Sequence, residues 1–148
     1  MSSGGDLNEE IVEHLFTLVE HLRAGFEAAA ADCDLSVAQA KALRYVAIAG
    51  PVPMRDLACR MRCDASNVTG IIDRLEERGL VERRAEPGDR RVKSLVATPH
   101  GGEVALALWR QVRTSAATLL QMTDDECSAL VFLLRRVDQA PLIVTGPR

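Results

Sequence analysis

The sequence predicts a mainly α-helical fold with one small β-hairpin, and three observations lead to that prediction. Apolar residues make up 47% of the chain and aromatic residues only 3%. The core must therefore consist of Leu, Val, Ile and Ala side chains, which favours helices. Apolar residues recur at steps of three and four along most of the chain, which is the period of an amphipathic helix. Only residues 80–84 and 92–97 read as strands, and the turn residues Pro87-Gly88-Asp89 lie between them.

The first two helices are predicted from an apolar stripe and a capping pattern. A helix from about Asn8 to Asp32 carries apolar residues at helical spacing, namely Ile11, Leu15, Leu18, Val19, Leu22 and Phe26. At 1.5 Å per residue this helix would be roughly 37 Å long, and such a length suggests that it also serves an interface. Ser36 and Gln39 have the spacing of a capping box, which starts a second helix, and Gly50-Pro51 ends that helix.

A third and a fourth helix follow, separated by a tight turn. Pro53 suits the start of the third helix, whose inward side chains are Leu57, Ala58 and Met61. Residues 62–64 form the turn, and Asp64 is a suitable N-cap for a fourth helix that runs to Arg78. Gly79 is the expected left-handed C-cap of this helix. The inner face of the fourth helix consists of Val68, Ile71, Ile72 and Leu75.

The last two helices are predicted from their caps and their apolar spacing. Thr98 followed by Pro99 starts a fifth helix, and residues 123–126 form a second capping box that starts a sixth, which Pro141 ends. The stripe of the fifth helix consists of Val104, Leu108, Val112, Ala116, Leu119 and Leu120, and that of the sixth of Leu130, Leu133, Leu134 and Val137. The apolar stripes at both ends of the chain exceed what a small central lobe could cover, which favours a homodimer. The alternative is that they cover only their own core.

Two short helices joined by a turn and followed by a hairpin form a winged helix-turn-helix, whose second helix can enter the major groove of DNA. The predicted fold class is therefore a winged helix-turn-helix core flanked by N- and C-terminal dimerisation helices. It divides the chain into a dimerisation helix (residues 1–34), a DNA-binding lobe (residues 35–98) and dimerisation helices (residues 99–148).

The distribution of charge supports this interpretation better than the total does. The formal net charge of −3 alone argues weakly against nucleic acid as a partner. Between Arg55 and Lys93, however, there are ten basic and eight acidic residues, against eight and thirteen in the rest of the chain. The positive charge gathers where the groove-reading elements are predicted.

The start of the fourth helix offers short hydrogen-bonding side chains, from Ser66, Asn67 and Thr69. Short side chains let a helix N-terminus come close to base edges and phosphates; Asn can read adenine, and a Thr methyl can pack on thymine. Gly70 costs about 1 kcal/mol inside a helix, and its missing side chain could admit either DNA or a neighbouring helix. Arg74 and Arg78, one and two turns further on, suit phosphates. The alternative for Ser66 and Asn67 is that they only cap the helix.

The tip of the hairpin carries a second set of basic residues. Asp89 could hold an arginine in a bidentate pair and aim it into a narrow minor groove, whose potential attracts arginine. The arginines at the tip are Arg90 and Arg91, and the residues that could line the stem toward phosphates are Arg83, Arg84 and Lys93. The alternative is a solvated loop without a partner.

With these elements in place, the chain resembles the MarR family of bacterial winged-helix transcription regulators. The matching segments lie between Leu35 and Gly101: LSVAQAKALRYV, LACRM, SNVTGIIDRLEERGLVERR and EPGDRRVKSLVATPHG. The resemblance implies a sequence-specific regulator, in most cases a repressor, that binds double-stranded DNA at a pseudo-palindrome. It also implies a homodimer built from the first, fifth and sixth helices. By the same likeness Ser66, Asn67, Thr69 and Arg74 lie on the reading helix, Asp89 and Arg91 form the wing pair, and Arg90 is an added basic neighbour.

The resemblance also raises the question of what such a regulator would sense. Many members are released from DNA by small phenolic or lipophilic ligands, in a pocket between the dimer helices and the winged lobe. The candidate walls of that pocket are Leu15, Val19, Leu43, Val46 and Trp109. A thiol-based redox sensor is an alternative, because Cys59 and Cys63 lie beside arginines that could lower a thiol pKa. Cys33, at the far end of the first helix, departs from the position used by the peroxide-sensing branch.

Other classes of function find little support in the sequence. No Gly-rich phosphate loop, Cys-x-x-Cys pair or Gly-x-Ser-x-Gly motif occurs, so we expect neither an enzyme nor a cofactor. His14, His21 and His100 are too scattered to predict a metal site. No run approaches 18 apolar residues and no signal peptide is recognisable, so we expect a cytoplasmic protein without a membrane span. A winged-helix module that binds proteins instead of DNA remains the other alternative.

Overall fold

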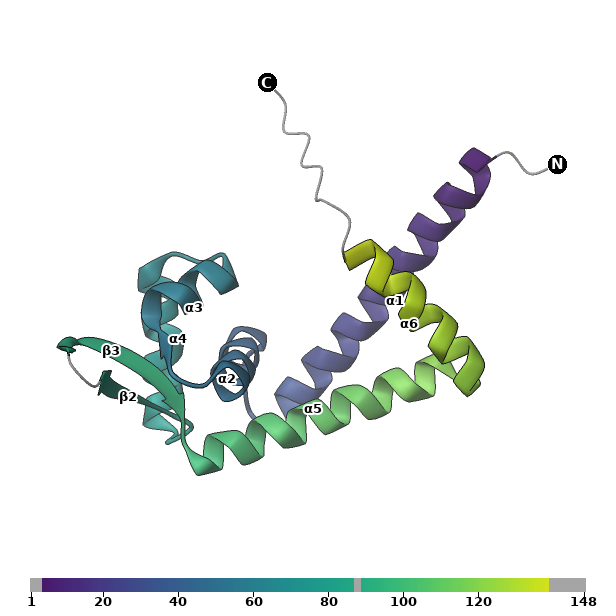
Figure 1. The fold of residues 1–148 in the computed structure, drawn as a ribbon. Coiled ribbons are helices and arrows are strands. Elements are labelled where there is room, and N and C mark those ends of the chain that lie inside the picture. Colours follow the sequence, from purple (N-terminus) through teal and green to yellow (C-terminus); the bar gives the residue numbers. More distant parts are fainter. Residues whose placement is uncertain (1–3, 87–88, 139–148) are drawn as a thin grey trace, which may run out of the picture. The chain divides into compact units, whose positions relative to one another are not determined.

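The computed structural model describes residues 4–86 and 89–138, which form six helices and a three-stranded sheet (Figure 1). The predicted fold class, mainly α with a β-hairpin wing, is confirmed. In chain order the elements are α1 (Gly4–Asp32), α2 (Val37–Ala49), β1 (Val52–Pro53), α3 (Met54–Met61), α4 (Ala65–Glu77), β2 (Val81–Glu86), β3 (Asp89–Ala97), α5 (Pro99–Leu120) and α6 (Asp124–Asp138).

The chain divides into two compact units, residues 1–116 and residues 117–148. The first contains α1 to α4, the sheet and most of α5, and the second contains the end of α5 and all of α6. The predicted domain boundaries after residues 34 and 98 were drawn from the expected function of each segment, whereas the two compact units are defined by contacts within the fold. The predicted boundaries therefore stay a prediction.

Both predicted capping boxes are present. The Ser36 Oγ accepts a hydrogen bond from the Gln39 backbone N–H at 3.2 Å, and the Gln39 Oε1 accepts one from the Ser36 N–H at 2.9 Å. The Glu126 carboxylate accepts the Thr123 N–H at 2.8 Å, and these contacts with Thr123 lower the pKa of Glu126. Asp64 is the N-cap residue of α4 as predicted, but its side chain makes no capping hydrogen bond.

A residue with positive φ lies at the end of each of α1, α3 and α4. Gly79 has φ +65°, and the Leu80 N–H donates to the Leu75 carbonyl at 2.9 Å, so Gly79 forms the predicted left-handed turn, one residue after the C-cap Arg78. Asp34 after α1 and Arg62 after α3 adopt the same conformation with φ values of +54° and +51°, although neither is glycine. The ends of α1 and α4 are in contact, because the Arg78 side chain at the end of α4 donates a hydrogen bond to the Asp34 carbonyl.

The sheet corrects the sequence-based prediction in two places. β1 was not predicted: Val52 pairs with Leu95 and Pro53 with Ser94, which makes β3 the middle strand of the order β1-β3-β2. Pro53 is therefore a strand residue as well as the N-cap of α3. The strands of the hairpin are also longer than predicted. β2 runs from Val81 to Glu86, and β3 begins at Asp89, which was assigned to the turn. Pro87 and Gly88 lie outside the described residues.

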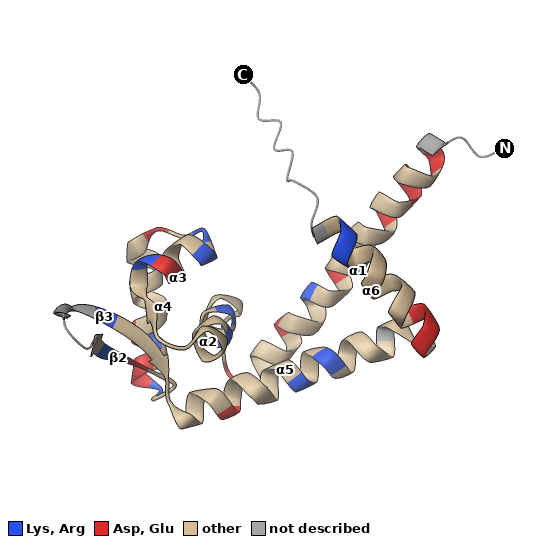
Figure 2. Ribbon diagram, viewed as in Figure 1, with Lys and Arg blue, Asp and Glu red and all other residues tan. Residues whose placement is uncertain are grey.

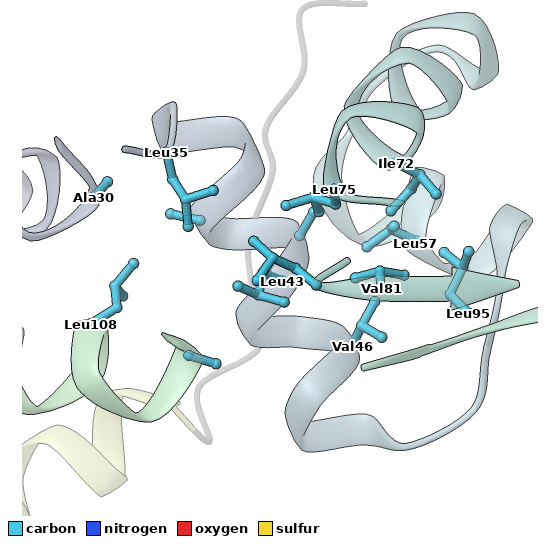
Figure 3. Close-up of a cluster of buried hydrophobic side chains, with 14 of the residues drawn as sticks. Ala30, Leu35, Leu43, Val46, Leu57, Ile72, Leu75, Val81, Leu95 and Leu108 are labelled. Atoms are coloured by element: carbon cyan, nitrogen blue, oxygen red, sulfur yellow. The ribbon is translucent and has the colours of Figure 1, made fainter. Parts of the chain in front are cut away.

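The core contains side chains from α2, α3, α4 and the sheet, together with side chains from the end of α1 and from α5 (Figure 3). The predicted inner face of α4 is confirmed for three of its residues, which are fully buried, while Ile71 is half-buried. The fully buried large apolar side chains of the core are Leu43, Val46, Leu57, Val68, Ile72, Leu75, Leu80, Val81, Leu95 and Leu108. At about 25 cal/mol per Å² of apolar surface, each contributes roughly 1.5–3 kcal/mol to folding.

The predicted stripe of α1 is not part of this core. Only the end of the helix is buried, at Ala29 and Ala30, and Phe26 is half-buried. Ile11, Val19 and Phe16 are exposed by 54%, 59% and 70%. The structure therefore leaves an apolar stripe of α1 exposed.

The junction between the hairpin and α5 is a close backbone contact. The Thr98 Oγ1 donates to the Gly79 carbonyl at 2.6 Å and accepts the Gly101 N–H at 3.0 Å. Gly101 is thereby drawn against Leu80, where a Cβ atom on residue 101 would overlap the Leu80 carbonyl oxygen. The glycine in the Thr-x-x-Gly segment is thus required by the approach of α5 to the end of α4.

Gly101→Ala should therefore destabilise the fold by about 1–3 kcal/mol, because the backbone of Leu80 cannot move aside cheaply. Gly102→Ala is the matched control, since a Cβ at position 102 meets nothing within 4 Å. It should leave stability unchanged or raise it by up to about 1 kcal/mol. Urea denaturation of the two variants measures both effects, and equal midpoints would contradict the role given to Gly101.

Candidate nucleic-acid interface

The first turn of α4 presents its polar side chains to solvent. Ser66 and Asn67 are exposed, and within residues 4–86 and 89–138 neither side chain has a hydrogen-bond partner. Because α4 begins at Ala65 with Asp64 as N-cap, these two residues do not cap the helix. The Thr69 hydroxyl donates to the Ala65 carbonyl at 2.8 Å, which leaves its methyl group as the exposed feature. The turn therefore carries unpaired donors and acceptors on an open surface.

Gly70 lies on this same surface and has no internal reason to be glycine. A Cβ at position 70 would meet nothing within 4 Å, and its backbone is ordinary helix. Close packing against another helix of the described chain, one of the two roles expected from the sequence, is therefore not observed. The helix forgoes about 1 kcal/mol relative to alanine here, and clearance for an external partner is the remaining physical reason.

Two of the three acidic side chains of α4, Asp73 and Glu76, pair with one arginine of the wing strand. Arg83 on β2 reaches back to α4, where its Nη2 donates to Asp73 Oδ1 at 2.7 Å and its Nη1 pairs with Glu76. The Arg83 backbone N–H donates to the same Glu76 carboxylate at 3.1 Å. Arg83 itself, predicted to face phosphates, is only 22% exposed and is engaged by protein carboxylates.

The arginine within α4 and the arginine that caps its C-terminal end have different surroundings. Arg74 is exposed and forms no ion pair within the described part of the chain. It lines an open hollow beside Gly70, and the other charged residues of that hollow are Asp34, Asp73, Glu77 and Arg78. Arg78 is exposed as well, but its guanidinium already has protein partners: it donates to the Asp34 carbonyl at 2.5 Å and to the Cys33 carbonyl at 3.1 Å.

The wing extends the basic surface away from α4. Arg84 is 64% exposed and pairs with Glu82 on the same strand, and Lys93 is exposed on β3. The backbone of Asp89, Arg90 and Arg91 is part of β3, whereas their side chains lie outside the described residues. Figure 2 shows that acidic residues lie along the first half of α1 and at the start of α6, so the negative excess lies outside the lobe.

The five residues predicted to line a ligand pocket have different surroundings, and their role as pocket walls stays a prediction. Leu43 and Val46 are fully buried in the core of the lobe, and Leu15 and Val19 are exposed on α1. Trp109 does line a hollow of about 650 Å³, which is within the usual size of ligand sites. The other residues of this hollow were not predicted: Phe26, Lys41, Arg44, Tyr45, Ile48, Ala49, Arg60, Met61 and Arg62.

This hollow combines aromatic rings with positive charge. The Arg44 guanidinium lies 3.7 Å from the centroid of the Trp109 ring, and the Arg60 guanidinium lies 5.7 Å from that of Tyr45. The Arg44 Nε is buried and has no hydrogen-bond partner in the described structure. The signal that could have revealed the site is the run Lys41, Arg44, Tyr45, Ile48 on one face of α2, which is polar where a core face would be apolar.

All four cysteines are free thiols. Burial raises the pKa of Cys33, and the neighbouring Asp32 raises it further, so its thiolate is disfavoured. Cys59 is exposed, and the Cys63 thiol is 3.3 Å from the Met61 carbonyl, to which it donates. None of these contacts is a specific sign of a redox site, and the thiol-based alternative stays a prediction.

Neither a metal cluster nor a membrane-spanning helix occurs in the described part of the chain. Residues 4–86 and 89–138 contain no group of three or more His, Cys, Asp and Glu side chains suited to a metal ion. Among the described helices, none combines the length and the apolar character that crossing a bilayer requires.

Comparison with known proteins adds independent information on the lobe. The model of the MarR family matches residues 35–93. The chain is similar to the uncharacterized HTH-type transcriptional regulator YfiV of Bacillus subtilis, with 28% identity over 67% of this chain and 62% of that protein. The match thus covers less than two thirds of YfiV. It is also similar to the HTH-type transcriptional repressor NicR of Pseudomonas putida, with 27% identity over 89% of this chain and 84% of NicR.

Solved structures share the fold over almost the whole chain. A MarR family protein from Bacillus stearothermophilus aligns with a TM-score of 0.82 at 20% identity, over 93% of this chain and 97% of that one. A point mutant of MepR from S. aureus, bound to an oligodeoxyribonucleotide, aligns with a TM-score of 0.65 at 19% identity, over 85% and 94% of the two chains. At these identities the likeness concerns the fold alone.

Replacing Arg83 tests whether the wing strand is fastened to α4. Arg83→Met should lower the free energy of unfolding by about 1–3 kcal/mol, because it leaves the half-buried Glu76 carboxylate without its partner. Arg84→Met is the control, since the exposed pair with Glu82 should contribute less than about 1 kcal/mol. Thermal unfolding compares the two variants, and an Arg83 effect no larger than that of Arg84 would refute the clamp.

Proposed function

Residues 35–93 of this chain belong to the MarR family of DNA-binding transcription regulators, and on that premise we propose that the protein is a repressor that binds a pseudo-palindromic operator as a homodimer. The observation that carries the proposal is the exposed first turn of α4. Its side chains at Ser66 and Asn67 have no partner in the described chain, and Gly70 beside them leaves open space.

In the proposed complex the first turn of α4 reads bases in the major groove. Asn67 is suited to adenine, the exposed methyl of Thr69 to thymine, and Ser66 to either base edges or phosphate. Arg74 contacts a phosphate one turn further along the helix. Arg83 is left out of this set, because its guanidinium is already bound by Asp73 and Glu76.

The wing is proposed to contact DNA beside the reading helix. Arg91, oriented by Asp89, enters the minor groove, while Arg90, Arg84 and Lys93 contribute charge near the phosphates. Because Arg83 ties β2 to α4, the wing and the reading helix would approach DNA as one rigid surface.

The homodimer is proposed from the apolar stripe of α1. Its exposed residues need a partner, and a second copy of the same stripe would provide one with two-fold symmetry. Such a dimer has to hold its two α4 helices roughly 34–36 Å apart to enter successive major grooves on one face of DNA. Bound over a promoter, it would exclude RNA polymerase. NicR, a relative that is named as a repressor, supports repression over activation.

Release by a small aromatic anion is proposed as the second part of the function. The hollow beside Trp109 offers flat apolar walls and a guanidinium, a combination that favours a ring with a carboxylate. It is formed by residues of α1, α2, α3 and α5, so a ligand there would touch both the reading lobe and the proposed dimer helices.

Gly70→Ala separates DNA binding from stability. The variant should be more stable by about 0.5–1 kcal/mol, since alanine is the better helix residue and meets no neighbour. It should nevertheless bind more weakly, by about tenfold or more, to duplexes that the wild-type protein selects from a randomised DNA library, because the added methyl group blocks close approach.

Fluorescence anisotropy at several salt concentrations measures this affinity, and the wild-type affinity should fall steeply with salt. Gly102→Ala serves as the control that adds the same methyl group away from α4. If Gly70→Ala is more stable and binds as tightly as the wild type, the first turn of α4 does not meet DNA. If the wild-type protein selects no duplex, or sediments as a monomer, the proposed function is wrong.

The effector site is tested with benzoate and its neutral analogue benzamide. Trp109 is the only tryptophan of the chain, so its fluorescence reports binding in the hollow. Arg44→Met should weaken benzoate binding by about tenfold or more, because a charge-assisted hydrogen bond is lost, and should change benzamide binding little. Arg110→Met, an exposed charge next to Trp109 that does not line this hollow, is the control. Equal binding of the two ligands by the wild type would exclude an anion site.

A further inference from the structure

The C-terminal end of α1 lacks a cation of its own. Its last turn contains no basic residue, and Asp32 and Asp34 add negative charge there. A helix C-terminus carries partial negative charge and carbonyl groups without helical partners. The left-handed turn at Asp34 satisfies two carbonyls through the N–H groups of Asp34 and Leu35, and it turns the next carbonyls outward.

Arg78 supplies the missing cation from another element. It is the C-cap residue of α4 and lies 44 positions after Asp34 in the sequence. Its two Nη atoms donate to the adjacent carbonyls of Cys33 and Asp34, at 3.1 and 2.5 Å. A guanidinium that spans two carbonyls fixes direction as well as distance, which a lysine ammonium would not do.

The same corner also holds α5. The Gln111 Nε2 donates to Asp32 Oδ2 at 3.3 Å, and a Cβ on Gly25 would lie 3.4 Å from the Cβ of Ser115. The last turns of α1 are therefore attached to α4 through Arg78 and to α5 through Gln111. Both contacts lie within residues 1–116, which form one unit.

We infer that Arg78 is a positioning residue for DNA recognition, which fixes the reading helix α4 to the end of α1 without touching DNA. The inference rests on the proposed function, because α1 is the helix that would join two copies. Through Arg78, the proposed dimer contact of α1 determines where each α4 lies. The neighbouring Arg74, one turn earlier and free of protein partners in the described structure, has the opposite role of contacting phosphate.

The test compares Arg78→Met with Arg74→Met on three duplexes: a selected duplex with both half-sites, the same duplex with its half-sites moved apart by one base pair, and a single half-site. Arg78→Met should weaken binding to the first by about tenfold, while binding to the single half-site changes little. Its preference for the original spacing over the shifted one should also decrease. The slope of log affinity against log salt should equal that of the wild type, since no phosphate contact is lost.

Arg74→Met is the contrasting control. It should weaken binding to all three duplexes alike and lower the salt slope by about 1. The inference is overturned if Arg78→Met also lowers the slope, if it weakens all duplexes equally, or if it keeps the wild-type spacing preference. Whether the wild type binds the selected duplex tests the proposed function, and the comparison of the variants tests the role of Arg78. The two proposals can therefore fail independently.

A second variant and a measurement without DNA cover the case of an unfolded Arg78→Met. Arg78→Lys keeps the charge but not the two-carbonyl geometry, so it should remain folded and still lose part of the spacing preference. Hydrogen exchange of the free protein gives an independent check. The amides of residues 33–35 should exchange faster in both variants than in the wild type and in Arg74→Met. Unchanged exchange there would mean that Arg78 does not hold the corner.

Discussion

Burial of one face of α4 is the constraint on which the rest of this structure depends. Val68, Ile72 and Leu75 are completely enclosed between α2 and the sheet, so the helix cannot rotate without exposing them. Because a helix repeats every 3.6 residues, fixing these positions also fixes the residues that point the other way. Asn67 and Gly70 are exposed for this reason. The position of the proposed reading surface thus follows from core packing, and its exposed residues can vary as long as the buried face is kept.

The arginines around α4 show that residue type alone does not determine function. Arg74, Arg78 and Arg83 lie within ten positions of one another, and each has a different environment. Arg74 has no protein partner in the described chain, Arg78 binds two main-chain carbonyls, and Arg83 binds two carboxylates. Only the first is available to a phosphate without breaking an existing contact. The number of basic residues counted in the sequence therefore overstates the number of arginines that are free to bind a phosphate.

The parts of the fold that were predictable from the sequence are those with local causes. Capping at Ser36, the left-handed turn at Gly79 and the buried face of α4 follow from residues within a few positions of one another. β1 could not be predicted, because two residues show no period and their pairing with Leu95 spans 43 positions. The contact made by Arg78 could not be predicted either, because its partner carbonyls lie at the end of α1, far from it in the sequence. Leu43 and Val46 were placed in a pocket because a periodic apolar pattern cannot distinguish a side chain inside a core from one that lines a cavity.

The contact between Gly101 and Leu80 restricts how this molecule can change shape. It holds the first turn of α5 against the end of the hairpin-bearing lobe, main chain against main chain, so no hinge is available at residues 98–101. In the proposed homodimer, a ligand that alters the separation of the two lobes would have to bend a helix or slide one helix along another. Such a displacement would be small where the ligand binds and larger at the far end of a long helix. The 22-residue α5 is suited to transmit it for this reason.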